Sequence, residues 1–108
     1  MSRTAHRYLL VRFLTKDPIS AQAIEEAVRH SVEEMFGKFG SAEIKARLMG
    51  VSSAGDKATF RCALGSVEKL RTALAMISHV NGQPAAAMVV KSSGTIKALR
   101  VRFQRQQK

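Results

Sequence analysis

The chain has 108 residues, of which 45% are hydrophobic, so we expect one domain over residues 1–108 with its own core. Its formal net charge of +10 favours a polyanionic partner, and no apolar run approaches the ~20 residues that a transmembrane helix needs. We therefore expect no membrane partner. The lone Cys62 and the lack of a signal-peptide pattern predict an intracellular, cytoplasmic protein without an internal disulfide.

The first part of the chain predicts a strand followed by an amphipathic helix. Residues 7–14 are rich in aromatic and aliphatic side chains, and the proline that follows ends the strand. Apolar residues then recur every three or four positions over 24–36, which is the period of a helix with one buried stripe. Ser20 or Asp17 can cap this helix, and Gly37 is placed to end it.

The middle of the chain predicts a hairpin and a second helix. Residues 43–48 alternate apolar and charged side chains, which indicates a half-buried strand at the edge of a sheet. A turn over 52–56 leads to a second strand over 58–64. Ser66 is expected to cap a helix whose core face runs as far as Val80, where an Asn-Gly pair ends it.

The last part of the chain predicts one more strand and a basic segment. A proline opens the strand over 85–90, and residues 92–94 form a turn. Apolar residues between 96 and 103 then recur at helical spacing among basic residues, which predicts a short helix followed by a flexible tail over 103–108. A fifth strand through 98–103 is the alternative for this segment.

The order strand, helix, strand, strand, helix, strand predicts an α+β fold. We expect a two-layer α/β sandwich of the ferredoxin-like or RRM-like βαββαβ type, in which two helices cover one face of a four-stranded antiparallel sheet, with an extra C-terminal helix. Because the first and last strands are apolar on both faces, the second face also needs cover, from the C-terminal helix, a protein partner or a second copy. The predicted partner interface consists of Tyr8, Leu10, Arg12, Leu14 and Met88.

The charges are unevenly distributed along the chain. Residues 1–16 carry four basic residues and no acid, residues 69–108 carry eight and no acid, and residues 17–68 hold all eight acids. If the two basic ends converge in space, they create a positive field that attracts polyanions, most often nucleic acid. A solvated surface that merely favours solubility is the alternative.

The residues give no sign of catalysis by the protein itself. The three histidines lie apart in the sequence, and no metal-binding spacing or phosphate-cradling glycine motif occurs. We therefore expect no catalytic residue, no metal ligand and no cofactor bound by the protein. The aromatic signature of base-stacking RNA-recognition motifs is also incomplete, with Phe60 beside Arg61 in the third strand, which favours contact with phosphates rather than bases.

Several short segments together carry a family resemblance. They are His6-Arg7-Tyr8-Leu9-Leu10, Phe36-Gly37-Lys38-Phe39-Gly40-Ser41-Ala42, Arg61-Cys62, Val80-Asn81-Gly82 and Ser93-Gly94-Thr95-Ile96-Lys97. Their order and spacing, from about His6 to Phe103, resemble the ribonuclease P protein component 2 family of archaea, which is related to the Pop/Rpp-type subunits of eukaryotes.

The resemblance implies a non-catalytic subunit of a ribonucleoprotein endonuclease that removes the 5′ leader from precursor tRNA. In that family the ribonuclease P RNA performs the chemistry with bound Mg²⁺. The protein stabilises the catalytic RNA and pairs with a barrel-shaped subunit, component 3, often as a dimer of heterodimers. Two alternatives remain open, which are another RRM-like RNA-binding subunit of a ribonucleoprotein and a protein-interaction module that binds no RNA.

Lysine and arginine side chains can neutralise crowded RNA phosphates and release their counterions. The predicted phosphate contacts are Arg3, Arg7, Lys91, Lys97, Arg100, Arg102 and Arg105. Hydroxyl and backbone N–H donors of Ser93, Gly94 and Thr95 are expected to add a phosphate site at a helix N-terminus, with an ordinary helix cap as the alternative.

Overall fold

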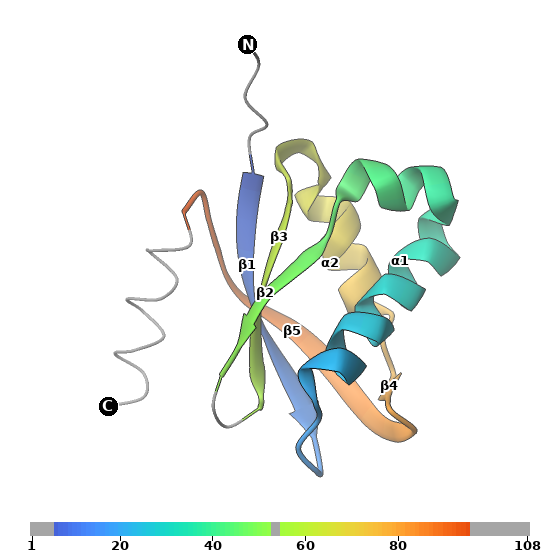
Figure 1. Ribbon diagram of the computed structural model, residues 1–108, viewed down its shortest axis with the longest axis vertical. Helices are drawn as coiled ribbons and strands as arrows, with labels where there is room; N and C mark the ends of the chain where they lie inside the picture. Colours follow the sequence, from blue (N-terminus) through green and yellow to red (C-terminus); the bar gives the residue numbers. More distant parts are fainter. Residues whose placement is uncertain (1–5, 53–54, 96–108) are drawn as a thin grey trace.

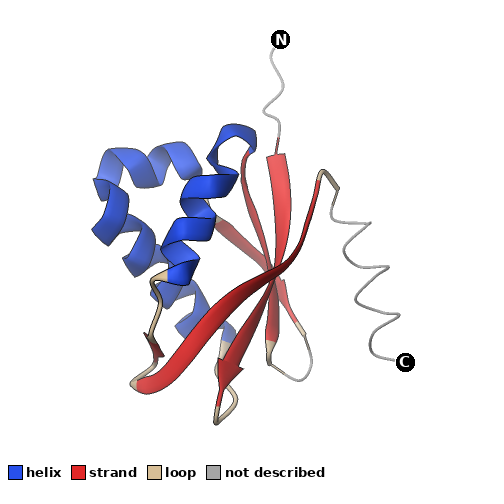
Figure 2. Cartoon of the chain, turned by 180° about the vertical axis from the view of Figure 1, so that it is seen from behind, coloured by secondary structure: helices blue, strands red, loops and turns tan. Residues whose placement is uncertain are grey.

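The computed structural model describes residues 6–52 and 55–95, which form one antiparallel sheet and a helical layer (Figure 1). Its elements are β1 (His6–Thr15), α1 (Ala21–Ile44), β2 (Arg47–Val51), β3 (Lys57–Ala63), the 3-10 helix η1 (Leu64–Ser66), α2 (Val67–Ala75), β4 (His79–Val80) and β5 (Gln83–Ser93). The strand order is β2-β3-β1-β5-β4, and α1 and α2 lie on the same side of the sheet (Figure 2). The predicted α+β class is confirmed. The strand predicted near residues 43–48 corresponds to β2, and its predicted position at the edge of the sheet is also confirmed.

The sheet has five strands rather than the four predicted. The additional strand lies where the prediction extended the second helix. Helix α2 stops at Ala75, and the chain forms the short strand β4 instead of a further helical turn. Asn81 and Gly82 both have positive φ values, 54° and 83°, which suit the two-residue turn of a hairpin and join β4 to β5. The predicted C-terminal helix, and the alternative strand through 98–103, lie outside the described residues.

The first helix is longer than predicted. Gly37 interrupts the helical backbone, with φ 71° and ψ −179°, but the helix resumes and continues to Ile44. The expected loop after Gly37 and the expected strand start at residue 43 are therefore wrong. Lys45 ends the helix in the left-handed region, with φ 54° and its N–H donating to the Ser41 carbonyl at 3.1 Å. At the other end, the predicted cap is confirmed, since Ser20 Oγ accepts from the Ala23 N–H at 3.1 Å.

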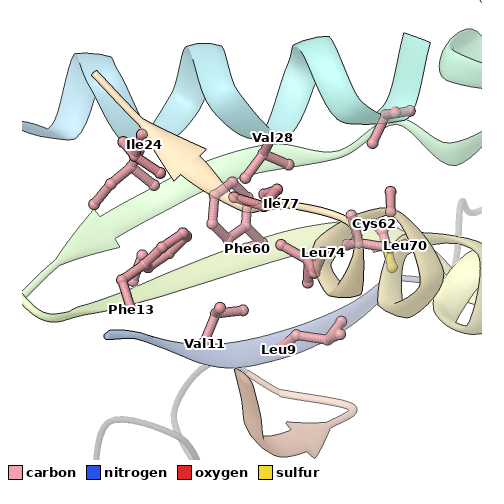
Figure 3. Packing of buried hydrophobic residues seen from close by; sticks show 14 of the residues in the cluster. Leu9, Val11, Phe13, Ile24, Val28, Phe60, Cys62, Leu70, Leu74 and Ile77 are labelled. Atoms are coloured by element: carbon pink, nitrogen blue, oxygen red, sulfur yellow. The ribbon is translucent and has the colours of Figure 1, made fainter. Parts of the chain in front are cut away.

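The core lies between the sheet and the two helices, where alternate residues of each strand meet the helical stripes (Figure 3). The buried side chains include Leu9, Val11 and Phe13 from β1, Phe60 and Cys62 from β3, Ile24, Val28 and Val32 from α1, and Leu70 and Leu74 from α2. Burial also raises the pKa of the Cys62 thiol, so it remains a neutral apolar residue, as predicted. Two expectations are wrong here. Met35, which the helical spacing over 24–36 assigns to the buried stripe, is exposed, and Ser66 makes no side-chain cap bond to α2.

Candidate nucleic-acid interface

The two layers of the fold carry opposite charge. The strands contain six basic residues and no acid, and these are Arg7, Arg12, Arg47, Lys57, Arg61 and Lys91. Helix α1 carries five acids against two basic residues, and the remaining acids lie on α2 and in loops. Folding therefore separates charges that the sequence mixes, and it leaves the sheet positive.

Basic side chains line up across the face of the sheet that α1 and α2 leave uncovered. Arg47 on β2 pairs in register with Arg61 on β3, Arg61 with Tyr8 on β1, and Tyr8 with Ser93 on β5. In the rows below, Lys91 is opposite Leu10, and Lys57 is opposite Arg12. These rows follow one another along the strands. The cations are therefore spread over the sheet from β2, at its edge, to β5.

Most of these cations have no acidic neighbour. Among the six strand cations in residues 6–52 and 55–95, Lys57 is the one that forms an ion pair. Its Nζ lies 3.5 Å from Asp56 Oδ2. The other ion pairs found there lie on the helices, namely His30 with Glu34, Lys69 with Glu43 and Arg71 with Glu68. A phosphate that approached the sheet would thus meet lysine and arginine groups that carboxylates do not already neutralise.

The structure brings together some of the predicted phosphate contacts. The Arg7 guanidinium lies beside Gly94, since a Cβ built on Gly94 would be 3.6 Å from Arg7 Nη1. The Thr95 N–H donates to Ser93 Oγ at 3.2 Å, which satisfies one of the backbone donors predicted for a phosphate. Lys91 lies two residues before Ser93 on β5. The other predicted contacts, Arg3, Lys97, Arg100, Arg102 and Arg105, lie outside the described residues.

Three of the predicted partner residues, Arg12, Leu14 and Met88, lie toward the opposite end of the same face, whereas Tyr8 and Leu10 lie in the rows of cations. Leu14 is 44% exposed and pairs in register with Ala86, while Met88 is 53% exposed and pairs with Arg12. Leu14, Ala86 and Met88 form an apolar patch, and Arg12 lies beside it. Leu10 differs from them because it is only 3% exposed, and Tyr8 is half-buried. Leu10 is therefore already covered within this chain, whereas Leu14 and Met88 are open to a partner.

A set of basic residues at the junction of α1 with the sheet was not predicted from the sequence. A cavity of about 250 Å³ is lined there by His6, Ala42, Lys45, Ala46, Arg47 and Arg61. These cations belong to the acid-containing middle of the sequence, so a count of charge along the chain cancels them against the acids of α1. The alternation of Arg47 and Arg61 with core residues indicates the solvent face of each strand, but only the pairing of the two strands places the arginines side by side.

The described part of the chain shows neither a metal site nor a membrane span. Within the two described ranges, no group of three or more His, Cys, Asp or Glu side chains is placed to hold a metal ion. In the same residues, no helix is both long enough and apolar enough to cross a membrane.

The chain is similar in sequence to archaeal proteins named ribonuclease P protein component 2. The protein of Methanocorpusculum labreanum is 33% identical over 91% of this chain and 65% of its own length. Those of Methanosarcina acetivorans and Thermococcus gammatolerans are 29% and 28% identical over 94% of this chain, which spans 75% and 84% of their lengths. The chain thus spans slightly less than two thirds of the first of these relatives.

The fold is also found in a solved structure. A chain in the cryo-EM structure of yeast ribonuclease MRP superposes with a TM-score of 0.71 over 99% of this chain and 95% of that one. At 11% sequence identity, this likeness shows the shared fold. The sequence model described as the Rpp14/Pop5 family matches residues 7–104, nearly the whole chain, and the protein therefore belongs to the Rpp14/Pop5 family.

Proposed function

We propose that this chain is a protein subunit of ribonuclease P, which removes the 5′ leader from precursor tRNA in the cytoplasm. Membership of the Rpp14/Pop5 family and the names of the archaeal relatives support the assignment to ribonuclease P. The sheet, whose strands carry no acidic residue, supports contact with the RNA of that enzyme. The order of the long strands, β2-β3-β1-β5, supports a ferredoxin-like arrangement within this proposal.

In this role the protein supplies positive charge rather than a catalytic group. The RNA holds the Mg²⁺ ions and cleaves the phosphodiester, and the strand cations bring phosphates of the folded RNA close together. Each phosphate that a lysine or arginine neutralises releases counterions, which lowers the free energy of a compact RNA at low magnesium concentration. The observation that carries the proposal is the sheet with six cations and no acid.

The apolar patch supports a protein partner at the other end of the sheet. We assign Leu14, Ala86 and Met88 to contact with component 3, because the large apolar side chains of Leu14 and Met88 are open there. A dimer of such heterodimers is the assembly that we propose. The RNA and the protein partner then use different ends of one face and can bind at the same time.

Reconstitution tests this function directly. Catalytic RNA is assayed for leader cleavage at low Mg²⁺ with component 3, with and without this chain, and we expect the chain to raise the rate. The double variant Arg7→Glu with Lys91→Glu should lose the effect. Arg29→Glu with Lys38→Glu on α1 changes the net charge equally and should retain it. A wild-type chain that leaves the rate unchanged would rule the proposal out.

A further inference from the structure

The cavity between α1 and the sheet has the chemistry of an anion site. Lys45 at the end of α1, Arg47 at the start of β2 and Arg61 near the end of β3 bring three cationic side chains to one cavity of about 250 Å³. No acidic side chain lines it. Glu43, the nearest acid along the chain, lies 3.8 Å from the Lys69 ammonium and is engaged there. The cavity is therefore positive and uncompensated.

Arg61 has an unused donor at this place. Its Nε is buried and has no hydrogen-bond partner, which is uncommon for a buried polar atom because the lost bond to water is not replaced. An arginine offers its N–H donors in a fixed planar fork that matches the oxygens of a phosphate or carboxylate. An anion in the cavity would place acceptors beside the guanidinium of this arginine, which lines the cavity.

Lys45 adds a second and independent sign. Its φ of 54° is in the left-handed region, where a residue with a Cβ is strained and where glycine is the usual helix-ending residue. The strained position therefore holds a lysine although a glycine would end the helix at lower cost. A backbone outlier of this kind at a cavity is consistent with a role for the side chain.

We propose that this cavity, formed by Lys45, Arg47 and Arg61 with His6 at its side, binds one phosphate group of the RNA backbone. This inference rests on the proposed function for the identity of the ligand. The cavity is large enough for a phosphate with several waters, since one water occupies about 30 Å³ in the liquid. It adds a fixed anchor at the β2 end of the sheet, where Arg47, Arg61 and Tyr8 form one row.

The salt dependence of RNA binding tests the anchor with matched controls. The affinity of the full chain for the catalytic RNA is measured over a salt series, and each lost phosphate contact should reduce the log–log slope by about 1. We expect that reduction for Arg61→Gln. Arg71→Gln removes one guanidinium that is already paired with Glu68 at 3.8 Å, and it should leave the slope unchanged.

Lys45→Gly separates the role of the side chain from stability. Lys45→Gly and Asn81→Gly each place glycine at a position with positive φ and should both leave the domain folded, but only Lys45→Gly should weaken RNA binding. Equal slopes for the variants and their controls would show that the cavity holds no RNA phosphate. This comparison remains valid even if Arg61→Gln lowers stability, because Lys45→Gly is expected to fold well.

Inorganic phosphate distinguishes failure of the anchor from failure of the proposed function. In an NMR titration of the wild-type chain, phosphate should shift the Lys45 amide and the Arg61 Nε–H signals, and Arg61→Gln should lose the Lys45 shift. This result supports the cavity even if the chain fails to stimulate cleavage in reconstitution. Absence of these shifts, with a normal stimulation of cleavage, would overturn the anchor and leave the proposed function standing.

Discussion

The hydroxyl of Ser31 on α1 donates a buried 2.6 Å hydrogen bond to the main-chain carbonyl oxygen of Ala73 on α2. The bond ties the two helices together within the layer that covers the sheet. Ser31→Ala should lower the free energy of unfolding by about 1 kcal/mol, the usual net contribution of one hydrogen bond. The cost stays modest because the Ala73 carbonyl still accepts from the Met76 N–H at 3.2 Å. Denaturant unfolding at neutral pH measures the difference.

An exposed bond of the same kind serves as the control for Ser31. Thr72 Oγ1 donates to the Glu68 carbonyl oxygen at 2.9 Å on the solvent side of α2. Thr72→Ala should change stability by less than about 0.5 kcal/mol, because water replaces the lost partner. Equal losses for the two variants would mean that burial of the Ser31 bond has no effect of its own.

The second half of α1 depends on a close approach between Gly40 and Phe36. A Cβ added at Gly40 would lie 2.5 Å from the Phe36 Cβ, which the backbone must move to avoid. Gly40→Ala should therefore destabilise the fold by about 1–3 kcal/mol, although alanine usually favours a helix. Gly65→Ala meets nothing within 4 Å and should be neutral or slightly stabilising. Thermal unfolding of the two variants compares them, and a stabilised Gly40→Ala would contradict the packing.

Periodicity predicted the parts of this fold whose pattern is local. The strand over 7–14, the buried stripe from Ile24 to Val32 and the strand over 58–64 follow from apolar spacing, and the structure has all three. The errors fall where two local signals compete. Gly37 predicts a helix end, but a kink accommodates it, and Asn81-Gly82 also predicts a helix end although this pair equally favours a hairpin turn.

The candidate site was less predictable because charge along a chain differs from charge in space. Arg47 and Arg61 lie fourteen residues apart in an acid-containing segment, yet strand pairing puts them opposite each other. Five of the eight acids of that segment lie on α1, on the other layer, and the others lie on α2 and in loops. Register between strands is set by the tertiary fold, so a single sequence gave no measure of which cations would share a face.

The turn between β2 and β3 should make part of the free energy of unfolding depend on pH in the acidic range. Burial alone would raise the pKa of Asp56, but the hydrogen bond from Ser52 at 3.0 Å and the Lys57 ammonium outweigh it, so the pKa lies below its usual value. A carboxyl group whose pKa is lower in the folded protein than in the unfolded chain stabilises the fold above the unfolded-chain pKa, which is about 4. This contribution is lost as the pH falls through the lower pKa of the folded protein.

NMR titration of the Asp56 carboxyl checks this expectation. The wild-type group should titrate below about pH 3.9, and Ser52→Ala should move its pKa back toward that value. The Asp56→Asn variant should lose less stability than the wild type between pH 5 and pH 2. We expect a small difference, because the Asp56 side chain is 39% exposed and water screens its charge. An unshifted Asp56 in the wild type would contradict the role of Ser52.

The apolar patch predicts which substitution should break the complex with component 3. Met88 is 53% exposed on the open face of β5, so Met88→Asp should leave the domain folded but place an unpaired carboxylate in the interface that we propose. Co-purification with component 3 should be lost. Met76→Asp changes a 63% exposed methionine at the end of α2 and should retain the complex.

Leu10 separates loss of the interface from loss of the fold. It lies on the same face as Met88 but is 3% exposed, so Leu10→Asp would bury a charge within this chain and should lower the melting temperature of the isolated protein. Met88→Asp should leave that temperature close to the wild-type value. If Met88→Asp still co-purifies with component 3, the partner binds elsewhere, and the exposed apolar side chains of β1 and β5 require a different occupant.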